Sequence, residues 1–247
     1  MTCYIKSFLV LMLIVSLNAF SEQSTEASKL YITNGMGDNH IYANVGRAIL
    51  VRCYNRIGIN IEIVDVPMDR MLKTVLDDKA DAALFSNFTT AQEYSESLEL
   101  INVPLFSLNI IAAYLDDSVN ISSIDDLKNY STAILQGTKS FEKILESVGA
   151  DFQTVTNIQS TIDMMIYGRV DYFLHSQYEF DSILRRIPKD IAPDIHLTDP
   201  ILSIDLYHII HKKHAHLAPL IESELLSMQA SGEMQNIIDD VIKSYQK

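Results

Sequence analysis

A short pattern that occurs twice, about ninety residues apart, restricts the fold of this chain more than any other feature. The second copy is a turn, an acidic residue and a run typical of a buried strand, Gly168-Arg169-Val170-Asp171-Tyr172-Phe173-Leu174-His175. The first copy is weaker but has the same order, Asp78-Lys79-Ala80-Asp81-Ala82-Ala83-Leu84-Phe85, and an amphipathic helix precedes each copy. Two copies predict two similar α/β lobes. Because open α/β sheets bind ligands beyond the ends of their strands, we expect a binding cleft between the lobes.

Hydrophobic spacing predicts alternating strands and helices along the chain. In the first half we expect strands at 30–33, 59–64 and 81–85, and helices at 41–54 and 68–76. In the second half we expect strands at 131–135, 152–155 and 171–174, and helices at 140–148 and around 162–166. Apolar runs with strand character lie at 108–114 and 204–210, and two helices divided at Gly232 end the chain. This order predicts mainly parallel sheets with helices on both faces.

The beginning of the chain has the pattern of a secretory signal peptide. One basic residue precedes an apolar run at 7–17, and small residues follow. The run is far shorter than the roughly 20 apolar residues that a membrane-spanning helix needs. We expect residues 1–21 to be a signal peptide, with cleavage after Ala19 or after Ser21, and the mature protein to be soluble and exported. Cys3 precedes the apolar run, so it is not the lipidated cysteine of a lipoprotein.

Charge and cysteine content exclude several classes of protein. The formal net charge is −13, with 19 basic and 32 acidic residues, which disfavours nucleic acid as a partner because phosphates require Lys and Arg. Once the signal peptide is removed, Cys53 is the remaining cysteine, so no intramolecular disulfide can form. The hydrophobic core must therefore stabilise the fold without covalent crosslinks.

Several short motifs follow one another in a characteristic order. They are Pro67-Met68-Asp69-Arg70, Asp81-Ala82-Ala83-Leu84-Phe85-Ser86-Asn87-Phe88-Thr89-Thr90, Leu135-Gln136-Gly137-Thr138, Gly168-Arg169-Val170-Asp171 and Met228-Gln229-Ala230-Ser231-Gly232-Glu233-Met234. In this order and spacing, the mature chain resembles the periplasmic solute-binding proteins of the amino-acid type, family 3, which have the type II periplasmic-binding fold. In the first motif, Met68 replaces the aromatic residue found in one branch of these proteins.

The resemblance implies an α/β protein of two lobes, each a mainly parallel sheet flanked by helices, joined by two hinge strands. It places the crossings at 108–112 and 205–209, so that lobe 1 consists of 22–108 with 209–247 and lobe 2 of 109–208. Ligand selects a closed form by contacting both lobes, which move as rigid bodies about the hinge. The resemblance also implies a periplasmic monomer without a cofactor.

Two departures from the family pattern concern the ligand. In the amino-acid binders an Arg holds the α-carboxylate, seven residues after a loop glycine; with Ser86 in the place of that glycine, the position is Glu93. The acidic residue that binds the α-ammonium group falls on Ser176. A ligand carboxylate next to Glu93 in a partly desolvated cleft would be repelled by several kcal/mol. We therefore expect a small polar ligand that is not a standard α-amino acid.

The remaining candidate ligand-binding residues are defined by their positions at strand ends. Arg70 could bind an anionic group in place of the missing Arg, with Glu93 facing a cationic group or solvent. Neutral hydrogen bonds would come from Asn34, Ser86, Asn87, Thr90, Gln136, Thr138, His175 and Ser176, and apolar walls from Phe85, Phe88 and Tyr178. Each residue has a structural alternative: a surface ion pair for Arg70, solvation for Glu93, capping for His175 and core packing for the phenylalanines.

The histidines His208, His211, His214 and His216 invite a metal site. Residues three apart on a strand point to opposite faces, so His208 and His211 would not converge, and the two lysines between them also disfavour a bound cation. We expect no metal site here.

Three classes of function fit these observations. The first is a binding protein that delivers its ligand to a membrane permease, and it is favoured by export, fold and the lack of a nucleophile motif. The second is a sensory protein whose closed form is read by a membrane receptor. The third is a periplasmic enzyme on the same fold, similar to the dehydratases, with Glu93 and His175 as an acid–base pair. We expect binding without catalysis.

Overall fold

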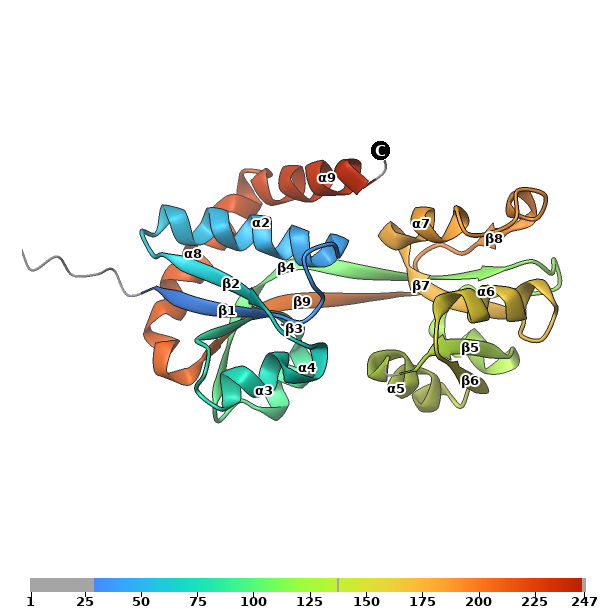
Figure 1. Cartoon of the computed structure of the whole chain (residues 1–247), viewed down its shortest axis with the longest axis horizontal. Helices are drawn as coiled ribbons and strands as arrows, with labels where there is room; N and C mark the ends of the chain where they lie inside the picture. The colour runs from blue at the N-terminus through green and yellow to red at the C-terminus, as the bar shows by residue number, and fades with distance from the viewer. Residues whose placement is uncertain (1–28, 137, 246–247) are drawn as a thin grey trace, which may run out of the picture.

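The computed structural model describes residues 29–136 and 138–245 and consists of two lobes side by side along the long axis (Figure 1). The expected signal peptide lies outside the described residues. Within the described part of the chain, no helix has the length and apolar character needed to cross a bilayer.

Lobe 1 contains the first strands and the last helices of the chain. Its elements are β1 (Leu30–Asn34), α2 (Ile41–Arg56), β2 (Ile61–Asp65), η1 (Met68–Arg70), α3 (Met71–Leu76), β3 (Ala82–Asn87), α4 (Phe88–Glu93), η5 (Lys212–Leu217), α8 (Ala218–Ala230) and α9 (Glu233–Tyr245). Strand β1 pairs in parallel with β2 on one side and with β3 on the other. Helices α2 and α9 lie on one side of this sheet and α3 and α4 on the other (Figure 1).

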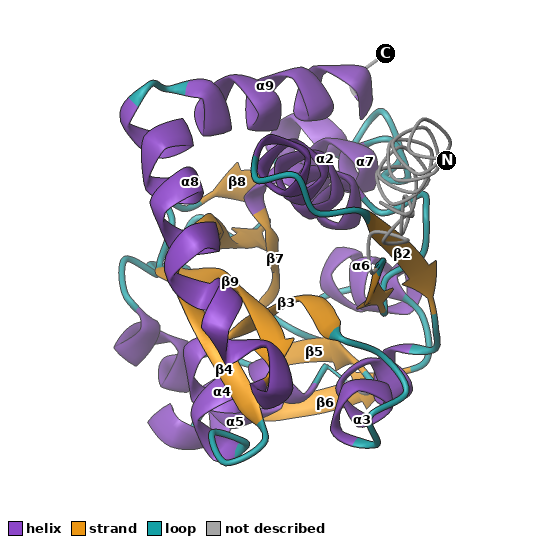
Figure 2. Ribbon diagram, turned by 90° about the vertical axis from the view of Figure 1, so that its left-hand side faces the viewer, coloured by secondary structure: helices purple, strands orange, loops and turns teal. Residues whose placement is uncertain are grey.

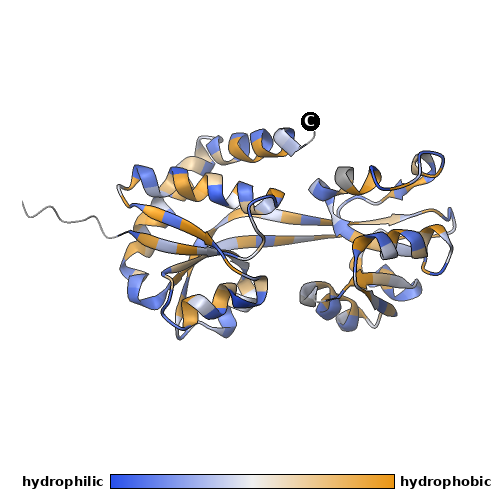
Figure 3. Cartoon of the chain, in the orientation of Figure 1, coloured by the Kyte–Doolittle hydropathy of each residue, from blue (hydrophilic) through white to orange (hydrophobic). Residues whose placement is uncertain are grey.

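Lobe 2 repeats this arrangement. Its elements are η2 (Ile124–Asn129), β5 (Thr132–Leu135), α5 (Lys139–Val148), β6 (Phe152–Val155), α6 (Ile158–Ile166), β7 (Tyr172–Ser176), η3 (Gln177–Glu179), α7 (Phe180–Leu184), η4 (Ala192–Asp194) and β8 (His196–Leu197). Strand β5 pairs in parallel with β6 and β7. Figure 3 shows that the helices of both lobes carry apolar and polar residues on different faces, as expected for helices that cover a sheet. The expected two-lobed α/β fold with mainly parallel sheets is confirmed.

Two long antiparallel strands join the lobes. They are β4 (Leu98–Tyr114) and β9 (Leu202–His211), which pair with each other and run from one lobe into the other (Figure 1). Figure 2, which views the molecule from one end, shows these two strands side by side. In the described chain the strand order is β2-β1-β3-β9-β4-β7-β5-β6, with β8 paired to β4. The apolar runs at 108–114 and 204–210 therefore belong to strands that are longer than the sequence predicts.

Packing along these strands changes at one paired position. Leu108 and Ile204 lie opposite each other and contact the hydrophobic clusters of both lobes. Leu206, which follows on β9, is already in the lobe 1 cluster. The limits of the lobes remain a proposal, and this packing moves the proposed limit on β9 from residue 208 to Ile204.

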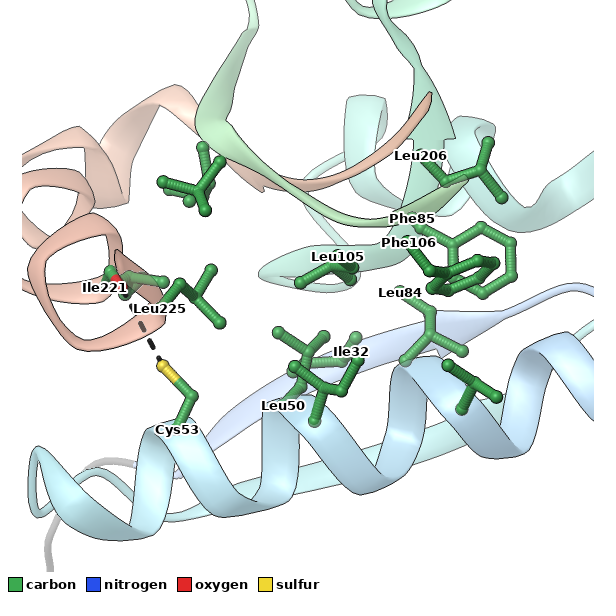
Figure 4. Close-up of a cluster of buried hydrophobic side chains, with 14 of the residues drawn as sticks. Ile32, Leu50, Cys53, Leu84, Phe85, Leu105, Phe106, Leu206, Ile221 and Leu225 are labelled. Carbon is green, nitrogen blue, oxygen red and sulfur yellow. Dashed lines mark hydrogen bonds between the residues drawn. The ribbon is translucent and has the colours of Figure 1, made fainter. Parts of the chain in front are cut away.

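The core of lobe 1 lies between its sheet and the helices α2 and α8. Ile32, Leu50, Leu84 and Leu105 are at most 1% exposed and meet in this layer (Figure 4). The Cys53 thiol is also buried there and donates to the carbonyl oxygen of Ile221 in α8 at 3.9 Å. A second, smaller cluster on the other face of the sheet holds α3 and α4 in place. Lobe 1 thus has packed layers on both faces of the sheet whose strand ends face lobe 2.

Candidate functional site

The strand ends that carry the repeated pattern lie next to the two hinge strands. Asn87 at the end of β3 is opposite Leu206 on β9, which is opposite Phe106 on β4. Ser176 at the end of β7 is opposite Ile110 on the same strand β4. At about 3.3 Å per residue, Phe106 and Ile110 are about 13 Å apart along β4. The two strand ends therefore flank one short segment of the hinge, at a separation that suits a small molecule.

A carboxylate lies at the lobe 2 strand end, although the position predicted for it is occupied by a serine. The Ser176 hydroxyl donates to Glu179 Oε2 at 2.6 Å, and His175 Nδ1 lies 3.8 Å from the same oxygen. The Glu179 side chain is 25% exposed. Because Glu179 follows Ser176 by one turn of η3, it places a negative charge next to the site of the missing acidic residue.

Lobe 1 contacts this carboxylate directly. His40, the residue before α2, has its Nε2 atom 3.1 Å from Glu179 Oε1. Burial alone would raise the pKa of Glu179, but the hydrogen bond from His40, the nearby charge of His175 and the bond from Ser176 outweigh it and lower that pKa to about 2. The carboxylate is therefore ionised at neutral pH. The pair between His40 and Glu179 crosses from one lobe to the other.

Three aromatic side chains form a cluster beside this pair. Tyr42 of α2 stacks on Phe106 at 5.7 Å between ring centroids and lies 6.3 Å from the ring of Tyr178 in η3. The buried atoms Tyr42 Oη and His40 Nδ1 have no hydrogen-bond partner among the described residues. Burial raises the pKa of Tyr42, and the nearby Ser176 hydroxyl partly opposes this effect. The contact region between the lobes thus has unused hydrogen-bonding capacity.

His175 is held in a state that favours the neutral ring. Burial lowers its pKa, and the negative charge of Glu179 only partly offsets that effect. Its Nδ1 atom also lies 3.5 Å from the carbonyl oxygen of Ser176. A neutral imidazole can both donate and accept a hydrogen bond, which suits a polar ligand.

Two of the predicted ligand residues in lobe 1 have hydrogen bonds within the fold. The Asn34 amide donates to Asp65 Oδ1 at 2.7 Å, and its oxygen accepts from the Met36 N–H at 3.1 Å. Asn87 caps α4 by accepting from the Thr90 N–H at 2.9 Å. Their amide oxygens therefore shape the loops that follow β1 and β3.

The other predicted residues of lobe 1 differ in burial. Phe85 is 5% exposed and makes an edge-to-face contact with Phe106 in the core, whereas Phe88 is 52% exposed at the start of α4. Ser86 is half-buried. Arg70 is exposed, and no acidic group of the described residues lies within ion-pair distance of it.

Glu93 lies at the end of α4 in an exposed position. The repulsion expected from the sequence assumed partial desolvation, and at this exposed site solvent screens it. The charge that dominates the contact region between the lobes is Glu179 instead.

The predicted residues on the other strand end of lobe 2 flank the start of α5. Gln136 is exposed, and its backbone N–H donates to the carbonyl oxygen of Val155 at 2.7 Å. Thr138 is half-buried at the N-cap position of α5. Their side chains have no hydrogen bond to another described residue, which leaves them able to contact a ligand.

The histidines near the end of β9 do not converge. His208 is fully buried in lobe 1, with Nε2 2.9 Å from the Tyr54 hydroxyl and Nδ1 3.2 Å from the carbonyl oxygen of Leu84. His214, on η5, instead pairs with Asp81, with 2.7 Å between its Nε2 atom and Asp81 Oδ1. Within residues 29–136 and 138–245, no group of three or more His, Cys, Asp or Glu side chains is placed to hold a metal ion.

Sequence reasoning missed His40 and Glu179. The signal that could have located Glu179 is its position three residues after Ser176, beyond the strand end that the repeated pattern marks. His40 follows the loop after β1, and β1 is parallel to β3, so the ends of these two strands lie at the same edge of the lobe 1 sheet. Strand ends of one parallel sheet lie at a common edge, so residues following each of them were candidates.

The likeness of this chain to known proteins lies in its structure. No family model matches the chain, and no curated protein sequence matches it. The ligand-binding core of GluR0 in complex with L-glutamate is similar, with a TM-score of 0.67 and 15% identity over 88% of this chain and 99% of that chain. The chain has the type II periplasmic-binding fold of amino-acid-binding periplasmic proteins.

Two further structures with this fold differ in their biological setting. The L-cystine solute receptor of Neisseria gonorrhoeae, in its unliganded open conformation, has a TM-score of 0.63 and 14% identity over 88% of this chain and 94% of that chain. A histidine kinase sensor domain with similarity to periplasmic binding proteins also has a TM-score of 0.63, with 12% identity over 86% of this chain and 95% of that chain. At these identities the likeness confirms the predicted fold and leaves the ligand open.

Proposed function

We propose that this chain is an exported binding protein that encloses a small polar ligand between its two lobes and does not convert it. The observation that carries the proposal is Glu179: a carboxylate of lobe 2, oriented by Ser176, that His40 of lobe 1 contacts at 3.1 Å. The charged group lies where strand ends of both lobes face each other. A ligand that takes the place of the His40 ring next to Glu179 would contact both lobes, and such contact is what favours the closed form.

The ligand proposed for this site carries a positively charged group. An ammonium or similar group can form a charge-assisted hydrogen bond with Glu179, which is ionised and partly shielded from water. Ser86, Thr138 and His175 would contact its neutral polar groups. At the position where an Arg would bind the carboxylate of an amino acid, the chain has the exposed Glu93. Amines and other cations without an α-carboxylate are therefore favoured over standard amino acids.

Binding without chemistry is the better account of the polar groups. The enzyme hypothesis required Glu93 and His175 to act together as acid and base. Glu93 is exposed at the end of α4, and the carboxylate near His175 is Glu179, at 3.8 Å. Glu179 has a pKa of about 2, far from the value near neutrality that suits a general base.

Delivery to a membrane transporter is the proposed role, in the periplasm, after removal of residues 1–21. A sensory role is the second candidate, because a histidine kinase sensor domain has the same fold at a TM-score of 0.63. The two roles differ in the partner that reads the closed form. Genes adjacent to the one for this chain would encode a permease and an ATPase in the first case and a signalling protein in the second.

A thermal-shift screen of the mature protein tests the proposal. The panel contains amines, quaternary ammonium compounds, sugars, short peptides and the standard L-amino acids. We expect cations without a carboxylate to raise the melting temperature of the wild type and to leave that of Glu179→Gln unchanged. The matched control is Glu146→Gln, which removes an exposed carboxylate on α5 of the same lobe and should behave like the wild type.

Two outcomes would contradict this function. Micromolar binding of several standard amino acids would show that Glu93 and Ser176 have been wrongly assigned to the positions of the carboxylate and ammonium anchors. Conversion of a panel compound without any stabilisation of the fold would show that the protein is an enzyme.

A further inference from the structure

A cavity of about 470 Å³ lies on the α2 side of the hinge, between α2, α9, β4 and η3. Its walls come from the helices of lobe 1 and from Asn109, Tyr178 and Ser203, which lie beyond the paired Leu108 and Ile204. Of the described ligand-binding residues predicted from the sequence, Tyr178 alone lines it, and neither His40 nor Glu179 does. The cavity therefore adjoins the site of the proposed function through Tyr42 and Tyr178, but it does not contain the charged pair of that site.

The lining of this hinge cavity is amphipathic and uncharged. Val45, Phe106 and Ile238 supply apolar surface, while Ser107 and Gln235 supply hydroxyl and amide groups. Among the lining residues that the structure describes, none has an ionisable carboxylate, ammonium, guanidinium or imidazole. A charged ligand would lose its hydration in such a cavity without gaining an ion pair. The volume falls within the range of ordinary small-molecule sites, about 300–1,000 Å³.

One polar atom in the wall lacks a partner. Tyr42 lines the cavity and is 2% exposed, yet its Oη atom has no hydrogen bond to any residue that the structure describes. Buried polar groups in native proteins are nearly always satisfied by protein, water or ligand. By contrast, Ser203 donates to Asn109 at 3.0 Å, and Gln235 donates to Asp239 at 2.8 Å. Tyr42 Oη thus has hydrogen-bonding capacity left at the edge of the cavity, where the Ser176 hydroxyl and the Tyr178 backbone lie near it.

We propose that the hinge cavity is a second binding site, for an uncharged molecule with an apolar body and a hydrogen-bonding group. The apolar body packs against Phe106 and Ile238, and the polar group bonds to Tyr42 Oη. Because the chain contains no tryptophan, large aromatic substitutions can fill this cavity and also report on it.

The uncharged dye Nile red and the anionic dye anilinonaphthalene sulfonate test the site by fluorescence titration of the purified protein. We expect saturable binding of Nile red and none of the anionic dye. Gln235→Trp fills the cavity and should weaken Nile red binding by about tenfold or more. Asn236→Trp is the matched control, since it places the same side chain at the next exposed position of α9, outside the lining, and should bind like the wild type.

Two further variants keep the test decisive. If Gln235→Trp unfolds, Ser203→Phe fills the cavity from β9 and should have the same effect. Tyr42→Phe retains the ring and removes Oη, so it should weaken Nile red binding several-fold while the melting temperature stays at or above that of the wild type. Absent or unsaturable Nile red binding, or equal affinity of Gln235→Trp and Asn236→Trp, would overturn the proposal. These titrations need no ligand for the site at Glu179, so either proposal can fail without the other.

Discussion

The contact between the lobes predicts that Glu179 titrates far below an ordinary carboxyl and that His40 is a main cause. The pKa of about 2 lies below the reference value of 4.5, and this difference corresponds to about 3 kcal/mol in favour of the ionised form. His40 shares this effect with His175 and Ser176, and the side chain of Glu179 is 25% exposed, so we assign roughly 1 kcal/mol to His40 after allowing for screening by solvent. His40→Gln should therefore raise the pKa of Glu179 by roughly one unit.

The sign of the effect on stability follows from the same numbers. Because the pKa of Glu179 is lower in the folded state, its contribution is complete above about pH 4.5 and is lost as the pH falls toward about 2. Carbon NMR of the Glu179 carboxyl measures the titration in the wild type, in His40→Gln and in His175→Gln. An ordinary pKa for Glu179 in the wild type, or the same value with and without His40, would refute a contact between the lobes in solution.

The remaining predictions concern stability. Burial lowers the pKa of His208 to about 4, so the unfolded state takes up a proton that the folded state rejects as the pH falls below 6.5. The free energy of unfolding, measured with urea, should therefore fall by about 2 kcal/mol between about pH 7 and pH 5. An equal fall in His208→Gln would contradict this assignment to His208. Leu225→Ala leaves a cavity in the core and should cost about 2–5 kcal/mol, whereas Leu226→Ala, at a position 53% exposed, should cost less than about 1 kcal/mol. Gly46→Ala places a Cβ 2.9 Å from the Phe85 ring and should destabilise the wild-type protein by about 1 kcal/mol. The same substitution should cost little in a protein that already carries Phe85→Leu, and similar losses in the two backgrounds would show that the ring is not the obstacle.

Much of the fold could be predicted because its determinants are local. The strands 131–135 and 152–155 are short runs bounded by polar residues, and the structure has β5 and β6 at the same places. The first half of β4 was not predicted because Pro104 interrupts the pattern and the register with β9 shifts on either side of it.

The site was predictable only in part, since its central contact joins residues distant in the sequence. The strand ends at Ser86 and Ser176 could be located from the repeated pattern. The approach of His40 to Glu179 depends on how the two lobes sit, which no local spacing encodes. Asn34 has the residue type of a ligand group, but an asparagine after a strand equally suits the loop hydrogen bonds that it makes here.

Small-angle X-ray scattering with and without a ligand from the thermal-shift screen tests the central claim most directly. If the ligand is enclosed between the lobes at Glu179, saturation should reduce the radius of gyration of the wild type and leave that of Glu179→Gln unchanged. An unchanged radius of gyration in the saturated wild type would contradict closure of the lobes on the ligand.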